Sequence, residues 1–188
     1  MTVFAVDVGL WVSGLAMFSP ASGSSYHHLS DVVIVEPPRS QRHIAPRAMA
    51  LALARAAQRM SLDGGLPGEA YRTSVWAVEH PVTRSTLRST HADVALLQEV
   101  SDQIAAAVVS KQHFREKVKP EAWKGQVPKN VHQGRILERL SLGELELLRR
   151  YRGQKSDHPN LKEALDAIGV GLWRTGRLRG TRSPGRLQ

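Results

Sequence analysis

The sequence predicts an α/β domain built on a mixed five-stranded sheet with helices on both faces. Five short apolar runs, rich in valine, have the length and composition of buried strands. Longer segments with apolar residues at helical spacing separate the later runs. The first three runs follow one another closely enough to pair as antiparallel neighbours, whereas the later strands are joined through helices. We therefore expect one sheet that contains both antiparallel pairs, joined by short turns, and parallel pairs, joined by helical crossovers.

The strands are expected at five segments: 3–8, 12–18, 31–35, 74–79 and 114–119. Their apolar and polar residues barely alternate, which indicates strands that are covered on both faces. Gly9 directly follows the first strand, at a position suited to a tight turn into the second.

The helices are expected at four segments: 45–65, 92–111, 130–150 and 159–173. The first segment is rich in alanine and ends in two glycines. In the second, apolar residues recur at helical spacing from Leu97 to Val108. Asp157 stands just ahead of Pro159, where it is placed to cap the last helix. The predicted order is β-β-β-α-β-α-β-α-α.

Composition excludes several classes of protein. The chain has 188 residues, 41% of them hydrophobic, and no cysteine. Disulfides, thiol catalysis and zinc–thiolate sites are therefore absent. No stretch approaches the roughly 20 apolar residues that span a bilayer, and no basic segment followed by an apolar one opens the chain. We expect a cytoplasmic protein without a membrane partner.

The charge favours a polyanionic partner. Lysine and arginine number 26 against 17 acidic residues, which gives a net charge of +9, and nucleic acid is the commonest partner of such proteins. A small basic protein that binds no nucleic acid is the alternative. The expected division is one domain over 1–175 and a basic, mobile tail over 176–188, because segment 174–188 holds five arginines and no acid.

Four acidic residues stand at positions that can converge. Asp7 and Glu79 each end an apolar strand, and Glu163 and Asp166 are neighbours on one face of the last helix. Carboxylates that meet in a partly buried place repel one another, and a divalent cation such as Mg²⁺ relieves the repulsion. Two such ions about 4 Å apart can stabilise both the attacking and the leaving oxygen in phosphodiester hydrolysis.

Each acid also has a structural explanation. Asp7 can cap the turn that follows it, Glu79 can pair with an arginine, and Glu163 and Asp166 can form the solvated face of a helix. Their joint placement, on two strand ends and one late helix of a basic protein, favours the metal site.

Three segments resemble the signature segments of the RuvC group of Holliday junction resolvases, within the RNase H-like superfamily. They are "DVGLWVSGLAMF", "VWAVEHP" and "LKEALDAIGVGLW". The resemblance covers roughly 1–175 and implies an RNase H-like fold. It also implies that Asp7, Glu79, Glu163 and Asp166 hold two Mg²⁺ ions, with Mn²⁺ as a substitute, and take part in catalysis.

The chain departs from the family at one ligand. Glu163 stands where the family commonly has aspartate and sometimes histidine. The extra methylene moves the carboxylate oxygens, so Asp157 is the alternative fourth ligand. The segment between the basic stretch and the last helix, "LSLGELELLRRYRGQKSDHP", is also longer than is usual for the group.

Basic residues are expected to contact the DNA. The resemblance places Lys124 and Lys129 near the scissile phosphate, with Lys124 as a catalytic residue that balances charge on the phosphoryl oxygens. Lys119 belongs to the same basic segment. Arg84 and Arg88 follow Glu79 in the sequence and are expected to contact a DNA strand at the junction centre. The alternative for that loop is a polar connection into the next helix.

Trp123 has two explanations in the same segment. It either stacks on a base or covers the sheet from within the core.

The resemblance implies a metal-dependent endonuclease that nicks branched DNA, with four-way junctions as the main substrate. It implies no organic cofactor. One ion would activate a water molecule and the other would stabilise the leaving 3′-oxygen. A homodimer is implied because a two-fold junction needs two symmetric cuts.

Three other classes remain open. The RNA-processing YqgF proteins and the sugar-kinase and actin-like ATPases also open with Asp-x-Gly, but those ATPases need about twice this length. The third class is a nucleic-acid-binding module that has lost the chemistry.

Overall fold

The computed structural model describes residues 1–40, 45–65, 71–81, 91–108, 114–125, 127–149 and 161–178. Its core is one five-stranded sheet in the order β3-β2-β1-β4-β5. The strands are β1 (Val3–Asp7), β2 (Ser13–Pro20), β3 (His27–Val35), β4 (Val75–Glu79) and β5 (Phe114–Val118). The first three pair antiparallel, whereas β4 pairs parallel with both β1 and β5. The predicted mixed sheet is confirmed.

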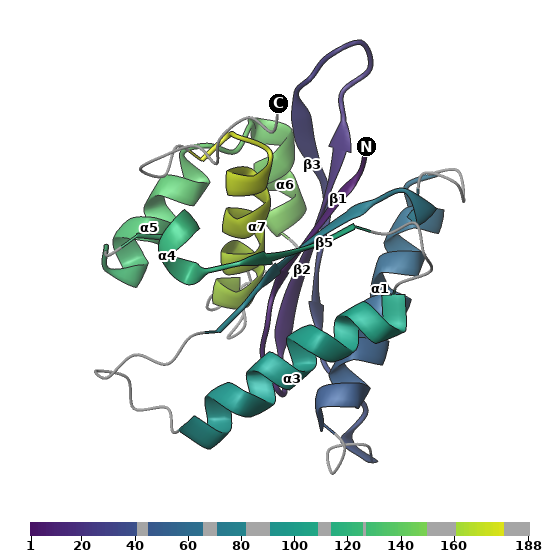
Figure 1. Cartoon of the computed structure of the whole chain (residues 1–188). Coiled ribbons are helices and arrows are strands. Elements are labelled where there is room, and N and C mark those ends of the chain that lie inside the picture. Colours follow the sequence, from purple (N-terminus) through teal and green to yellow (C-terminus); the bar gives the residue numbers. More distant parts are fainter. Residues whose placement is uncertain are drawn as a thin grey trace, which may run out of the picture.

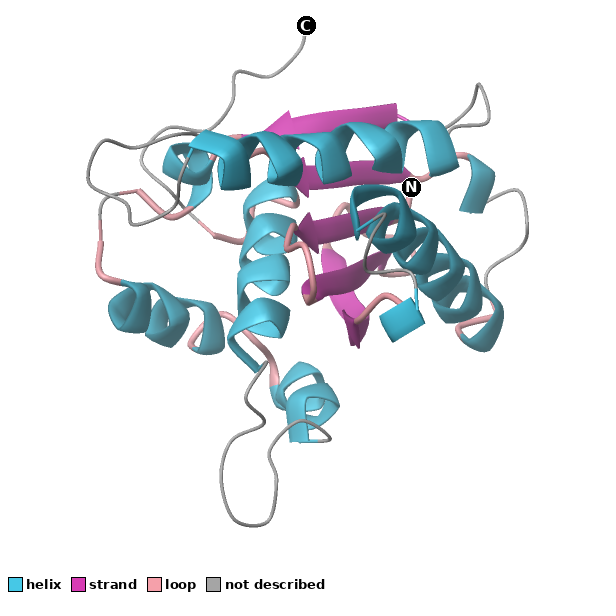
Figure 2. Ribbon diagram, turned by 90° about the horizontal axis from the view of Figure 1, so that it is seen from below, coloured by secondary structure: helices cyan, strands magenta, loops and turns pink. Residues whose placement is uncertain are grey.

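Helices cover both faces of the sheet, as predicted (Figure 1). They are α1 (Ala45–Asp63), α3 (His91–Val108), α4 (Pro120–Trp123), α5 (Lys129–Leu137), α6 (Leu142–Arg149) and α7 (Leu161–Arg174). Figure 2 shows the sheet between α1 and α3 on one side and the group around α7 on the other. Among the described helices, none is long and apolar enough to cross a membrane.

Alternate residues of β1 explain the two layers. Phe4 and Val6 pack into the core under α1 and α3, whereas Val3 and Ala5 pack into the core under α7. All four are at most 3% exposed. Side chains of a strand point to opposite faces in turn, so a strand that is apolar throughout needs cover on both sides.

The structure differs most from the predictions at two places. β3 begins at His27 rather than at residue 31. The helix predicted over 130–150 is two helices, α5 and α6, and the single-helix prediction was wrong. Ser141 and Glu144 form a reciprocal cap at the start of α6. The Ser141 N–H donates to Glu144 Oε2 at 2.8 Å, and the Glu144 N–H donates to Ser141 Oγ at 3.3 Å. This S-x-x-E capping box starts a new helix inside continuous apolar periodicity.

Glu144 also anchors the end of the described chain. Arg177 donates to both carboxylate oxygens of Glu144, at 2.7 Å for Nη2–Oε2, and the Leu29 N–H donates to Oε1 at 2.6 Å. Both charged side chains are buried, at 4% exposure for Glu144 and 8% for Arg177. Residues 176–178, which the sequence assigns to the tail, therefore pack on the domain. Residues 179–188 lie outside the described part.

We expect the Glu144→Gln variant to lose ~3 kcal/mol of stability at pH 7, because it leaves the Arg177 guanidinium buried without its charge partner. Burial alone would raise the pKa of Glu144, but hydrogen bonds from Arg177, Ser141 and Leu29 outweigh it and lower the pKa to about 2. The stabilisation is complete above the ordinary pKa of 4.5 and is lost as the pH falls towards 2.

Denaturant unfolding at pH 7 and at pH 3 measures this difference. Exposed Glu146 in the same helix provides the control, Glu146→Gln, which should change stability little at either pH. A deficit of Glu144→Gln that does not shrink at pH 3 would contradict the assignment.

Candidate metal centre

Asp7 and Glu79 lie at the same edge of the sheet. They are the last residues of β1 and β4, which are parallel neighbours with Val6 aligned to Val78. Parallel strands in register end together, so the two carboxylates leave the sheet side by side. Glu79 is 7% exposed. The apolar runs before each acid bury the strand, and the carboxylates stand where that burial ends.

Helix α7 brings Glu163 and Asp166 to this edge. Asp7 is paired with Gly14 across the β1–β2 ladder. A Cβ atom at Gly14 would lie only 2.0 Å from the backbone carbonyl oxygen of Glu163, so α7 rests directly on the strand backbone. Asp166 follows one turn later on α7 and is 4% exposed.

The carboxylates repel one another. Burial raises the pKa of Asp7 well above its ordinary value, and the negative charges of Glu79 and Asp166 raise it further. Burial also raises the pKa of Glu79, with Asp166 adding to the rise and Lys124 opposing it. Within the described part of the chain, no hydrogen bond or ion pair reaches the Asp7 carboxylate. The edge is therefore a cluster of negative charge that is costly to keep ionised.

Two lysines balance this charge. Lys124 Nζ lies 3.1 and 3.3 Å from the carboxylate oxygens of Glu79, and Lys129 Nζ lies 2.8 Å from Asp166 Oδ2. Burial lowers the pKa of Lys129, but the hydrogen bond and charge of Asp166, with Asp7 and Glu163, outweigh it and raise the pKa. The two lysines that the family resemblance predicts near the scissile phosphate thus contact two of the acidic residues.

Glu163 is held more loosely. Its side chain is 20% exposed, and Oε1 lies 3.6 Å from Lys162 Nζ. Its Oε2 is buried without a hydrogen-bond partner. This orphaned carboxylate oxygen fits a further cation ligand. Asp157, the alternative ligand, lies outside the described residues.

The donor set fits a divalent cation. Every candidate ligand is a carboxylate, the donor that Mg²⁺ prefers, and the repulsion at Asp7 is of the kind that a cation relieves. As the side chains stand, the described residues contain no group of three or more acidic or histidine side chains arranged to hold a metal ion. Lys124 and Lys129 pair with two of the carboxylates instead.

Trp123 and His132 pack against each other next to Lys124. Trp123 is 2% exposed, so it covers the core rather than stacking on a base. Lys124 Nζ lies 4.7 Å from the Trp123 ring centroid, and the His132 ring meets the same indole edge-on at 4.7 Å. Gly169 of α7 makes room for the indole, because a Cβ there would lie 2.2 Å from it. The sequence analysis did not single out His132. The glycine at position 169 of α7 is the sequence feature that could have indicated this close packing.

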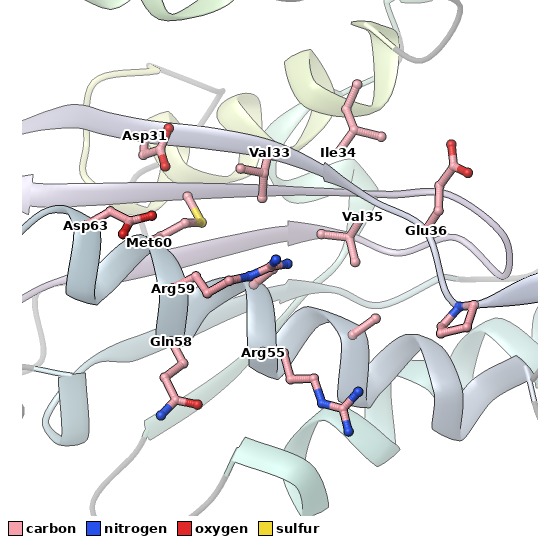
Figure 3. A pocket seen from close by; sticks show the side chains of 13 residues that line it. Asp31, Val33, Ile34, Val35, Glu36, Arg55, Gln58, Arg59, Met60 and Asp63 are labelled. Carbon is pink, nitrogen blue, oxygen red and sulfur yellow. The ribbon is translucent and has the colours of Figure 1, made fainter.

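The remaining predicted DNA contacts are only partly described. Lys119 is exposed at the junction of β5 and α4, whereas Arg84 and Arg88 lie outside the described residues. A separate groove of about 830 Å³ runs between β3 and α1 (Figure 3). Arg55 and Arg59 line it, and none of the predicted site residues does.

No family model matches the sequence. No curated protein matches it either. Solved structures do match. RuvC of Thermus thermophilus, in complex with a Holliday junction substrate, has a TM-score of 0.56 and 15% identity over 92% of this chain and 91% of its own. The fowlpox virus Holliday junction resolvase has a TM-score of 0.55 and 12% identity over 95% of this chain and 100% of its own.

The chain has the fold of the RuvC-type resolvases. The yeast mitochondrial Holliday junction resolvase extends the comparison, with a TM-score of 0.50 and 13% identity over 94% of this chain and 79% of its own. The RNase H-like fold that the three sequence segments imply is therefore confirmed. In this fold β1 and β4 end with Asp7 and Glu79 at the place where α7 crosses the sheet.

We expect the Asp7→Asn variant to be more stable than the wild-type protein when divalent ions are chelated. The substitution removes a buried negative charge that Glu79 and Asp166 repel. For a domain of this size each kcal/mol corresponds to about 2–4 °C in Tm. Thermal unfolding in EDTA and in Mg²⁺ provides the measurement, and Mg²⁺ should raise the Tm of the wild-type protein more than that of the variant. Asp63→Asn, at an exposed acid at the end of α1, is the control.

We expect the Gly14→Ala variant to lose about 1–3 kcal/mol, because its Cβ meets the Glu163 carbonyl and pushes α7 off the strand. The same displacement should reduce the stabilisation by Mg²⁺. Gly134→Ala is the matched control, since a Cβ there meets nothing within 4 Å, and it should leave stability unchanged or slightly raised. Equal stability of Gly14→Ala and wild type would show that the close contact is not required.

Proposed function

We propose that the protein is a metal-dependent endonuclease that cleaves branched DNA, with four-way junctions as its preferred substrate. The observation that supports this most is the meeting of Asp7, Glu79 and Asp166 at one edge of the sheet, with two lysines against them. The fold shared with Holliday junction resolvases supports the same substrate class.

Asp7, Glu79, Asp166 and Glu163 would hold two Mg²⁺ ions, for which Mn²⁺ can substitute. When bound, such ions activate water for in-line attack on the phosphodiester and stabilise the leaving 3′-oxygen. The protein's own contribution is placement. Strands β1 and β4 fix two carboxylates, and the contact of α7 with Gly14 fixes the other two.

The lysines have a second role in this proposal. Cations at the carboxylates would take over the neutralisation that Lys124 and Lys129 provide in their absence. Both ammonium groups then become available to phosphate oxygens, where they balance the charge of the reacting group. Lys129 can reach a substrate because its side chain is 55% exposed even when paired with Asp166. Lys124 is more fixed, since its ammonium lies over the buried Trp123 ring.

The net charge of +9 supplies affinity for the backbone that does not depend on sequence. Lys119, together with Arg84 and Arg88, which follow β4 in the sequence, would hold the DNA strands near the branch point. We further propose that two copies act together, because a four-way junction is resolved by two symmetric cuts.

A binding module without catalysis is the second candidate. The ion pairs of Lys124 with Glu79 and of Lys129 with Asp166 favour it, because they neutralise two of the acids without any metal. In that case the acids serve to hold lysines in place, and the basic surface alone carries the function.

A cleavage assay separates the candidates. Labelled four-way junction, Y-fork, duplex DNA and RNA of matched sequence are incubated with and without Mg²⁺ or Mn²⁺. We expect cleavage of the junction only with a divalent ion. Asp7→Asn should reduce the cleavage rate by about 10²- to 10³-fold, the range for loss of one group that stabilises charge in the transition state, while junction binding in EDTA stays close to that of the wild type.

Selective binding of the junction with no cleavage by any divalent ion would favour the binding module. Selective cutting of RNA would favour an RNA-processing enzyme of the YqgF type. Cleavage of Asp7→Asn at the wild-type rate would contradict the assignment of Asp7.

A further inference from the structure

Trp11 lies in the turn between β1 and β2, four positions after Asp7. Its side chain is 46% exposed, an unusual position for a large indole. Of the other tryptophans, Trp76 and Trp123 are at most 2% exposed. The turn therefore exposes nearly half of the Trp11 surface at the end of β1 that carries Asp7.

The turn that carries Trp11 is fixed from within. The Gly9 N–H donates to Ser13 Oγ at 3.0 Å, and the Ser13 hydroxyl lies 3.1 Å from the Gly9 carbonyl oxygen. Ser13 is fully buried, and Leu10 packs against the core under α1 and α3. A Cβ at Gly9 would lie 1.9 Å from the Val12 carbonyl oxygen, so the backbone closes tightly on itself. Trp11 is thus held on a rigid base.

Exposed lysines border the same edge of the sheet. The side chains of Lys129 and Lys162 are 55% and 57% exposed. Lys129 pairs with Asp166, and the Lys162 ammonium lies 3.6 Å from the Glu163 carboxylate. Lys162 precedes Glu163, whose backbone rests on β2 three residues after Trp11. An aromatic face with cations around it is the combination by which proteins bind unpaired or unstacked bases and the backbone next to them.

We propose that Trp11 stacks on a DNA base at the branch point, beside the phosphate that the carboxylate cluster receives. This inference rests on the proposed function and adds to it a means of selecting branched DNA. Inside a continuous duplex each base is covered on both faces by its neighbours. At a branch point the stack is interrupted, so a base face is available to the indole at low cost. Stacking of this kind tolerates any base and gives selectivity for structure rather than sequence.

The test measures binding in EDTA, where cleavage does not interfere. The wild-type protein, Trp11→Ala and Trp11→Phe are titrated with a four-way junction and with a duplex of the same sequence. Trp11→Ala should weaken junction binding by about 5- to 150-fold, the range for loss of one base–aromatic stack. Duplex binding should stay within about twofold, and Trp11→Phe should retain most of the junction affinity.

Tyr26→Ala is the matched control. Tyr26 is 47% exposed and precedes β3, at the opposite end of the β2–β3 hairpin from Ser13. It should leave junction binding unchanged. The Tm of Trp11→Ala should match that of the wild type, which separates lost contact from lost folding.

A second measurement reports the stack directly. A junction carries 2-aminopurine at a branch-point position, and a second junction carries it in the middle of an arm. Wild-type protein should change the fluorescence of the branch-point probe only, and Trp11→Ala should leave both unchanged.

The outcomes distinguish the inference from the proposed function. If the wild type prefers the junction and Trp11→Ala keeps that preference with the same branch-point fluorescence change, the inference is overturned and the proposed function stands. If the wild type binds junction and duplex equally in EDTA, the inference is overturned, and the cleavage assay decides the proposed function separately.

Discussion

The contact between α7 and the backbone of β2 determines the geometry of the whole acidic edge. At Gly14 the strand has no side chain, and the Glu163 carbonyl occupies the space that a methyl group would need. Gly171 repeats the arrangement with Phe18, whose ring lies 2.0 Å from the position of a Cβ there. Because helix and strand approach so closely at these two places, α7 has little freedom to slide. Asp166 is therefore delivered to Asp7 and Glu79 by packing rather than by a flexible loop.

This rigidity has an electrostatic cost that the fold offsets locally. Desolvation and mutual repulsion raise the pKa values of Asp7 and Glu79. The lysines that balance them are Lys124, which directly follows α4, and Lys129, the first residue of α5, and the Lys124 ammonium lies over the Trp123 ring. Lysine side chains paired with fixed carboxylates suit the proposed function, in which metal ions would replace the ammonium groups at the acidic residues. The charges of the two lysines partly offset the rise in the pKa of Asp7, and Lys124 does the same for Glu79.

Much of this arrangement could be predicted from the sequence, because it depends on local patterns. The apolar runs that end in Asp7 and Glu79 gave the strands, and the i,i+3 spacing gave the shared face of Glu163 and Asp166. The break between α5 and α6 was missed, because the apolar period runs through it and only the S-x-x-E cap marks it. Contacts between residues far apart in the sequence, such as that of Glu144 with Arg177, leave no local pattern from which they could be predicted.

The ion pair of Glu144 with Arg177 joins parts of the domain that are far apart in the sequence. Arg177 also donates to the carbonyl of His27, 150 positions earlier in the chain. Glu144 accepts from the Leu29 N–H of the same edge strand and caps the start of α6. One buried pair therefore ties together β3, the start of α6 and the segment that follows α7. Because these three parts share a single anchor, this corner of the domain is expected to open as one cooperative unit.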